Sequence, residues 1–148
     1  MIHDKQSVFL ADDDMDDCLL FEDALSEVSV SAKLTTAKDG IELMHLLEQK
    51  TPPPPDVIFL DLNMPRRNGF ECLNLIKQSQ DYKKIPVIIF STSCEPTFID
   101  KVYRLGANYY ICKPASFVKL KEAIFLVLSM NWSGENVQPS REEFLLTL

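Results

Sequence analysis

Three carboxylates of this sequence stand where apolar runs end. Asp12 and Asp13 follow the run SVFLA, and Asp61 ends the run DVIFLD. If these runs are parallel strands, the carboxylates meet at one edge of the sheet, where each pair repels by about 4 kcal/mol at ~4 Å and an effective dielectric constant of about 20. A hard divalent cation relieves this repulsion, and few protein oxygens plus several waters suit Mg²⁺ better than Ca²⁺. The pattern therefore predicts a magnesium site.

A hydroxyl group and an amine stand at the ends of two later apolar runs. Ser91 ends the run PVIIFS, and Lys113 follows NYYIC and precedes Pro114. Because the carboxyl ends of parallel strands share one edge, we expect the carboxylates, the hydroxyl group and the ammonium group to converge on one shallow site. The position of Lys113 between an apolar run and a proline argues against an ordinary surface lysine.

Other chemistries fit these residues poorly. Asp12, Asp14 and Asp16 match the start of an EF-hand loop, but Asp17 and Asp23 occupy the positions that need Gly and Glu. Asp16 and Asp17 are interpreted as solvated acids at a helix N-terminus, where they meet the helix dipole favourably. The chain has only four glycines, which match neither phosphate-binding glycine motif, and its two histidines do not follow apolar runs. No Ser–His–Asp or Cys–His pair is therefore expected.

Five short apolar runs alternate along the chain with five segments of helical periodicity. The runs span residues 7–12, 32–36, 56–61, 86–91 and 108–112, and the helical segments span 15–27, 41–49, 69–80, 95–105 and 116–130. The first, third and fourth runs are continuously apolar, which is typical of strands covered on both faces. Strict alternation predicts an α/β fold, a doubly wound five-stranded parallel sheet with right-handed crossovers and helices on both faces.

Length and charge argue against several classes of protein. The 148 residues suit one domain. Residues 1–30 hold nine acids and one base, a net charge of −8, and the rest of the chain carries +1, which gives the total of −7. Without a basic stripe for phosphate contacts, nucleic-acid binding is not expected. The longest apolar run has six residues, far below the ~20 of a membrane span, and a basic leader is absent, so we expect no membrane association and a cytoplasmic location.

The four cysteines, Cys18, Cys72, Cys94 and Cys112, form no C-x-x-C motif. With only two histidines available, a Cys/His zinc site is not expected. In a reducing compartment the four side chains are interpreted as free, mostly buried thiols.

Together these features resemble the receiver domain of two-component response regulators. The resemblance covers about residues 7–130 and includes the acidic pair Asp12–Asp13, the block VIFLDLNMP around Asp61, Ser91, and the block YICKP that contains Lys113. The spacings of 30 residues from Asp61 to Ser91 and 22 from Ser91 to Lys113 are typical of receivers. The resemblance implies the flavodoxin-like strand order 2-1-3-4-5. The segment QSQDYKKIP followed by VIIFSTS is similar to single-domain, chemotaxis-regulator-like proteins of the kind paired with phytochrome-type kinases.

The resemblance assigns a role to each of these side chains. Asp61 would accept a phosphoryl group from the phosphohistidine of a sensor histidine kinase or phosphotransfer protein. Asp13 and Asp61 would bind Mg²⁺, with Asp12 contributing directly or through water and Asn63 through its backbone carbonyl. Lys113 would pair with the phosphoryl oxygens. Phosphoryl transfer needs positioning and charge neutralisation more than covalent help from the protein, and a metal and a lysine supply both.

The resemblance also implies a switch and an interaction face. Ser91 would hydrogen-bond to a phosphoryl oxygen, and Tyr110 would be the aromatic switch residue whose ring orientation follows Ser91. Residues 131–148 are expected to form a tail without an output domain; the sequence leaves open whether this tail packs, hangs free or docks on a partner. A downstream target protein or a homodimer would use the face of the fourth helix, fifth strand and fifth helix, which carries surplus apolar residues (Ile99, Tyr103, Tyr109, Phe125 and Leu126).

The strongest alternative from another class is a small magnesium-dependent phosphatase that also uses an aspartyl phosphate. Such enzymes usually carry a second Asp two residues after the nucleophile, whereas this sequence has Asn63 and no cap insertion for a substrate. A degenerate receiver that serves as a constitutive binding module would lack the acceptor or the lysine, and Asp61 and Lys113 are both present. The expected function is a phosphoryl-accepting signalling receiver, which catalyses only its own phosphorylation and dephosphorylation.

Overall fold

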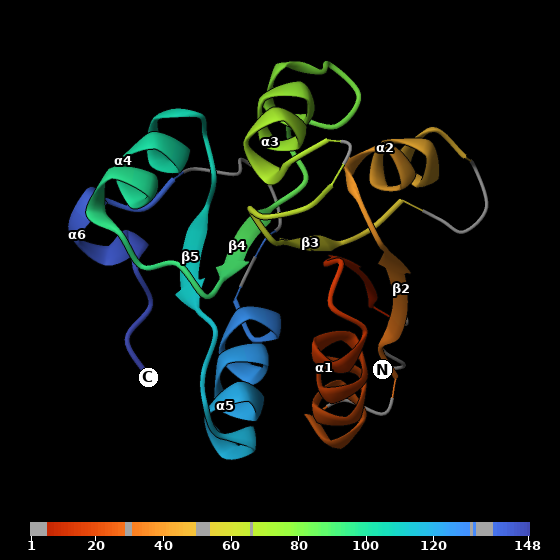
Figure 1. The fold of residues 1–148 in the computed structure, drawn as a ribbon, viewed down its shortest axis with the longest axis vertical. Coiled ribbons are helices and arrows are strands. Elements are labelled where there is room, and N and C mark those ends of the chain that lie inside the picture. The colour runs from red at the N-terminus through yellow and green to blue at the C-terminus, as the bar shows by residue number, and fades with distance from the viewer. Residues whose placement is uncertain (1–5, 29–30, 50–53, 66, 131, 133–137) are drawn as a thin grey trace.

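Five parallel strands form one sheet in the order β2-β1-β3-β4-β5 (Figure 1). The computed structural model describes residues 6–28, 31–49, 54–65, 67–130, 132 and 138–148. The strands are β1 (Ser7–Ala11), β2 (Lys33–Ala37), β3 (Val57–Leu60), β4 (Val87–Ser91) and β5 (Tyr109–Cys112). The helices are α1 (Met15–Val28), α2 (Gly40–Glu48), α3 (Gly69–Gln78), α4 (Pro96–Arg104), α5 (Phe117–Leu128) and α6 (Arg141–Phe144). The predicted fold and strand order are confirmed, and the ends of each predicted element differ by at most two residues.

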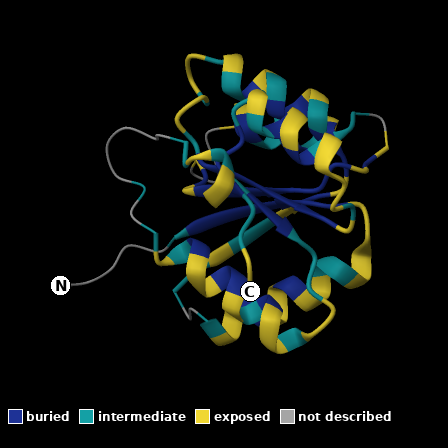
Figure 2. Cartoon of the chain, turned by 90° about the vertical axis from the view of Figure 1, so that its left-hand side faces the viewer, coloured by how far each residue is buried: buried dark blue, intermediate teal, exposed yellow. Residues whose placement is uncertain are grey.

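Two layers of helices cover the sheet (Figure 2). Val8 and Leu10 of β1 pack with α1 and α5 on one face, whereas Phe9 packs with α2, α3 and α4 on the other. Because alternate side chains of a strand point to opposite faces, β1, β3 and β4 are buried along their whole length. This burial on both faces explains why their sequences are continuously apolar. Within the described ranges, no helix is long and apolar enough to cross a bilayer.

Local sequence signals fix the ends of helices near the carboxyl edge of the sheet. Asn68 and Glu71 form a reciprocal capping box that begins α3. Gly69, the first residue of α3, lies so close to the backbone that an added Cβ would be 2.3 Å from the Asp61 carbonyl oxygen. Helix α3 therefore packs directly on the loop that follows β3. Gly106 follows α4 with φ of 105°, a conformation that favours glycine and confirms the predicted helix end.

The C-terminal segment packs on β5 and α4, which settles the placement of its described residues. Leu145 forms an isolated parallel bridge with Tyr110, and the Leu146 N–H donates to the Tyr110 carbonyl over 2.9 Å. Phe144 is fully buried, with its ring centroid 5.0 Å from that of Tyr103 and 6.3 Å from that of Tyr110. The tail therefore covers backbone groups at the outer edge of β5.

Candidate functional site

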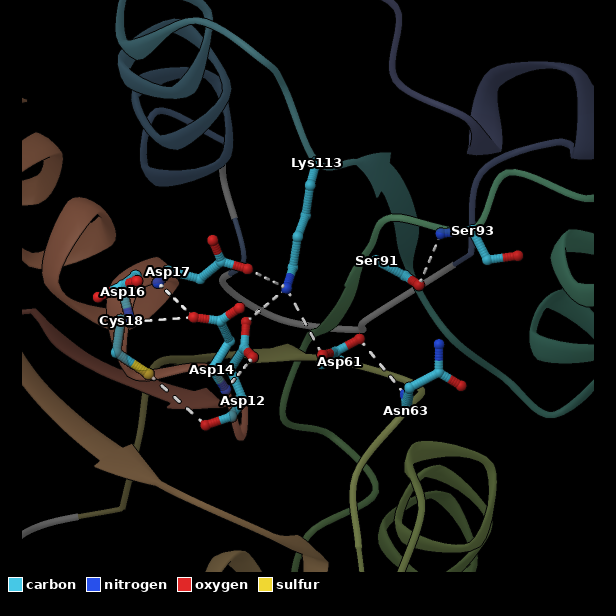
Figure 3. Close-up of polar contacts among 10 residues, drawn as sticks. All are labelled: Asp12, Asp14, Asp16, Asp17, Cys18, Asp61, Asn63, Ser91, Ser93 and Lys113. Carbon is cyan, nitrogen blue, oxygen red and sulfur yellow. Dashed lines mark hydrogen bonds and ion pairs between the residues drawn. The ribbon is translucent and has the colours of Figure 1, made fainter.

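The strand register brings the predicted site residues to the carboxyl edge of the sheet (Figure 3). The last paired residues of β1 and β3 are neighbours, so Asp12 and Asp61, which follow them, lie side by side. The Asp61 N–H donates to the Ala11 carbonyl over 2.9 Å. Strands β4 and β5 also end together, and the Lys113 N–H donates to the Ser91 carbonyl over 2.8 Å. Parallel pairing alone therefore gathers side chains that are far apart in the sequence.

Three carboxylates form the acidic part of the site. One oxygen from each of Asp12, Asp13 and Asp61 lies within 4.8 Å of the other two. Asp12 and Asp61 are 1% and 6% exposed, whereas Asp13 is exposed. The Asn63 N–H donates to Asp61 over 3.4 Å, which places the loop after β3 beside the cluster. These oxygens fit a hard divalent cation, because two buried carboxylates and a third at the rim leave room for water ligands.

The ammonium group of Lys113 is the counter-charge of this cluster. Its Nζ atom lies 2.7 Å from Asp12, 2.8 Å from Asp17 and 3.5 Å from Asp61 (Figure 3). Burial lowers the pKa of Lys113, but the hydrogen bonds to Asp12 and Asp17 and the charge of Asp61 outweigh it, so the pKa lies above the ordinary value for lysine. Lys113 therefore stays charged at neutral pH.

Asp61 carries a perturbed carboxyl group. Burial raises the pKa of Asp61 to about 6; the charge of Lys113 opposes this shift, and the charge of Asp12 adds to it. A cation bound among these carboxylates would favour the ionised form, which is the nucleophilic form of the group. The environment of Asp61 thus links metal binding to its reactivity.

Asp17 also belongs to the site. It lies in the first turn of α1, as predicted, but its interpretation as an acid exposed to solvent is wrong. Its side chain is 31% exposed, and its carboxylate is hydrogen-bonded to Lys113. Helical periodicity could have placed Asp17 at the site. Asp17 lies four residues before Phe21, a fully buried residue, and residues four apart share one face of a helix, here the inner face of α1. Asp16, which precedes it, is exposed as expected.

Ser91 and Tyr110 are connected through the turn that follows β4. The buried Ser91 hydroxyl accepts a hydrogen bond from the Ser93 N–H over 3.1 Å. The Tyr110 hydroxyl donates to the Ser93 carbonyl. The Tyr110 ring is already fully buried in this structure, where Phe144 of the tail packs against it. Ser93 therefore contacts both predicted switch residues, Ser91 through its N–H and Tyr110 through its carbonyl oxygen.

The cysteines depart from the prediction. Cys18 and Cys72 are free, as expected, but Cys94 and Cys112 form a disulfide, so the prediction of four free thiols is wrong. They are 18 positions apart in the sequence, across one crossover from β4 to the neighbouring strand β5, and the turn after β4 returns the chain over the end of β5. The spacing alone gives no sign of this contact, because it depends on the path of the turn.

Comparison with known proteins agrees with this arrangement. The family model "Response regulator receiver domain" matches residues 8–125. Response regulator Rcp1 from Synechocystis sp. is 34% identical over 110 residues, which cover 72% of this chain and 75% of Rcp1. Because the family model spans most of the chain, the match concerns the whole described sheet and its site.

Two solved structures share the fold. The phosphorylated cyanobacterial phytochrome response regulator RcpA has a TM-score of 0.76 at 34% identity, over 83% of this chain and 91% of RcpA. The Mn²⁺-bound form of response regulator Rcp1 also has a TM-score of 0.76, at 29% identity, over 91% of this chain and 99% of that one. These matches do not favour the alternative of a magnesium-dependent phosphatase. The chain belongs to the response regulator receiver domain family of two-component signalling, close to the Rcp1 and RcpA phytochrome regulators.

Proposed function

We propose that Asp61 accepts a phosphoryl group from a phosphohistidine of a sensor histidine kinase or phosphotransfer protein. The observation that carries this proposal is the convergence of Asp12, Asp13 and Asp61 beside the ammonium group of Lys113. Among the described residues, this is the one group of three or more His, Cys, Asp or Glu side chains close enough to hold a metal ion. A structure of RcpA in a phosphorylated form supports the assignment.

The metal in this proposal is Mg²⁺. Asp13 and Asp61 would bind it directly, Asp12 directly or through water, and Asn63 through its backbone carbonyl. The oxygen-only ligand set suits a hard cation, and the Mn²⁺-bound form of Rcp1 supports a divalent ion at a receiver site. When bound, Mg²⁺ neutralises charge on the carboxylates and on the incoming phosphoryl oxygens.

The reaction transfers a phosphoryl group between two protein side chains. A carboxylate oxygen of Asp61 bonds to phosphorus while the bond from phosphorus to the donor imidazole nitrogen breaks, and the imidazole leaves with the electron pair and takes up a proton. The product is an acyl phosphate whose phosphoryl group carries roughly two negative charges in place of the single charge of the carboxylate. Lys113 would turn from Asp12 and Asp17 toward the phosphoryl oxygens, and the Ser91 hydroxyl would donate to one of them.

The output in this proposal is a change of a protein-binding face. Residues 1–130 would be the receiver, residues 131–148 a tail, and a cytoplasmic target protein the downstream partner, with no free substrate turned over and no nucleic acid or membrane bound. A homodimer would use Phe125 and Leu126, which are 61% and 39% exposed on α5. The interpretation of Ile99 as a surplus apolar residue is wrong, because Ile99 is part of the core. Tyr103 is contacted by Phe144 of the tail, so a partner at this face would meet the tail as well.

Incubation with acetyl phosphate and Mg²⁺, followed by intact-mass and peptide mass spectrometry, tests the proposal. The wild-type chain should gain one phosphoryl group on Asp61, and Asp61→Asn should gain none. Asp16→Asn, which removes an exposed acid near the site, is the matched control and should behave like the wild type. Equal phosphorylation of Asp61→Asn would contradict the assignment, and rapid hydrolysis of many phosphoesters would favour a phosphatase.

A further inference from the structure

A covalent link joins two accessible cysteines next to the site. The Cα atoms of Cys94 and Cys112 are 5.8 Å apart, within the range that disulfides ordinarily span. Cys94 is exposed in the turn between β4 and α4, and Cys112 is partly exposed at the end of β5. Cys112 also lines an open hollow together with Pro114 and Leu146. A small reagent or a partner thiol can therefore reach the pair.

The other two cysteines are unsuited to redox chemistry. Cys72 is buried on α3, and Cys18 is only partly exposed on α1. Burial raises the pKa of each thiol to about 11, which suppresses the reactive thiolate. Cys94 and Cys112 are therefore the pair of cysteines better placed for reversible oxidation.

The link connects the two segments that carry the groups expected to respond to a phosphoryl group. Cys94 directly follows Ser93, whose N–H is bonded to the Ser91 hydroxyl. Cys112 directly precedes Lys113. A disulfide allows its Cα atoms to separate by only about 4.4–6.8 Å. The turn of residues 92–95, which follows Ser91, therefore cannot move far from β5 while the bond is present.

We propose that Cys94 and Cys112 form a reversible redox modification site, whose disulfide restrains the turn after β4 when Asp61 is phosphorylated. The assignment of the redox pair depends only on the positions of the two cysteines, whereas the restraint of the turn also rests on the proposed function. Oxidation would leave the acidic cluster intact and limit the movement of the turn that follows Ser91. The reduced protein would then respond fully to a phosphoryl group, and the oxidised protein would not.

A peroxide is the class of oxidant that suits this pair, and a dithiol is the class of reductant. The Cys94 thiolate attacks the O–O bond of hydrogen peroxide and becomes a sulfenic acid, with release of one water after protonation. The Cys112 thiol then forms the S–S bond and displaces a second water. In reduction, a thiolate of the dithiol attacks the exposed Cys94 sulfur, and Cys112 leaves as a thiolate and is protonated. The second thiol of the reductant then releases Cys94 and closes its own disulfide.

Thiol counting on the full denatured chain tests the redox pair. The protein should show four thiols after dithiothreitol and two after hydrogen peroxide. Cys94→Ser should keep its three thiols after peroxide, whereas the control Cys72→Ser should fall from three to one. Four thiols in the peroxide-treated wild type would overturn the pair.

Amide hydrogen exchange with Mg²⁺ and beryllofluoride, a phosphoryl mimic, tests the restraint. In the reduced wild type the mimic should change exchange at residues 91–95 by about tenfold, and in the oxidised form by less than about twofold. Cys94→Ser should respond like the reduced protein in either condition. Equal responses of the two redox forms overturn the restraint. If every form lacks this response and is also not phosphorylated by acetyl phosphate, the proposed function is overturned, and the restraint with it. The thiol count still tests the redox pair in that case.

Discussion

At the residue scale, the site is a balance between several carboxylates and one ammonium group. Lys113 contacts Asp12, Asp17 and Asp61, so each acid is only partly neutralised. Asp13 adds another negative charge at the rim. The ionised form of Asp61 is destabilised at this site, because burial and the charge of Asp12 both raise its pKa. Removing or neutralising a charge here should therefore change stability measurably.

Asp61→Asn should stabilise the metal-free protein at neutral pH. The pKa of Asp61 rises from 3.8 to about 6 on folding. The folded state therefore binds more protons between these values, and the free energy of unfolding falls as pH rises through this window. An uncharged amide avoids that loss, which is on the order of 2–3 kcal/mol above pH 7. Urea unfolding in EDTA at pH 4 and pH 8 measures the difference.

The control for this experiment is Asp16→Asn, whose exposed carboxylate should alter stability little and similarly at both pH values. If Asp61→Asn gains the same stability at pH 4 as at pH 8, Asp61 does not titrate as a buried acid.

Mg²⁺ should raise the melting temperature of the wild type and of Asp17→Asn, but hardly that of Asp13→Asn. Asp13 offers an oxygen within 4.8 Å of the other two carboxylates, whereas the Asp17 carboxylate is held by Lys113. The stabilisation follows RT ln(1 + [L]/Kd), about 1.4 kcal/mol at ten times Kd. Thermal melts across a Mg²⁺ titration measure it. An equal shift in Asp13→Asn would remove Asp13 from the proposed ligands.

Most residues of the site are predictable because strand ends are predictable. Asp12, Asp61, Ser91 and Lys113 each end or follow an apolar run, and parallel pairing carries all four to one edge. Asp17 is not predictable in this way, because its contact depends on which face of α1 packs against the sheet.

At the element scale, the packing of the tail on β5 could not be predicted from the sequence. Helix α6 has four residues, too few to show a periodic pattern, and its approach to β5 is marked by one isolated bridge, from Leu145 to Tyr110. The disulfide could not be predicted for the same reason, because it joins a residue of a turn to a residue of a strand. Both contacts depend on where irregular segments run, and neither propensity nor hydrophobic periodicity specifies that path.

Phe144→Ala should lower the free energy of unfolding by about 3–5 kcal/mol, because it empties a fully buried aromatic site beside Tyr103 and Tyr110. Exchange of the Leu146 amide, which is bonded to the Tyr110 carbonyl, should also accelerate. The control Leu148→Ala, at a residue 36% exposed, should change stability by less than about 0.5 kcal/mol. Similar small effects of both variants in urea unfolding would show that the tail does not pack on β5 in solution.

At the scale of the whole molecule, alternation of apolar runs and helical segments predicts the architecture. The inner strands β1, β3 and β4 have a neighbour on both sides and helices on both faces, so their continuously apolar sequences reflect burial directly. The acidic excess of residues 1–30 also has a structural meaning, since Asp12, Asp13 and Asp17 lie at the site. The fold thus concentrates negative charge at the edge where a cation and a phosphoryl group would bind.

A crystal structure of the full chain with Mg²⁺ and beryllofluoride is the most direct test of Asp61 as the phosphoryl acceptor. We expect beryllium bonded to a carboxylate oxygen of Asp61, with Mg²⁺ contacting Asp13 and Asp61. The Lys113 ammonium group should lie beside a fluoride instead of beside Asp17, and the Ser91 hydroxyl should donate to another fluoride. Beryllofluoride absent from Asp61 at saturating concentration, or bound there without Mg²⁺ and with Lys113 still on Asp17, would contradict the proposed function.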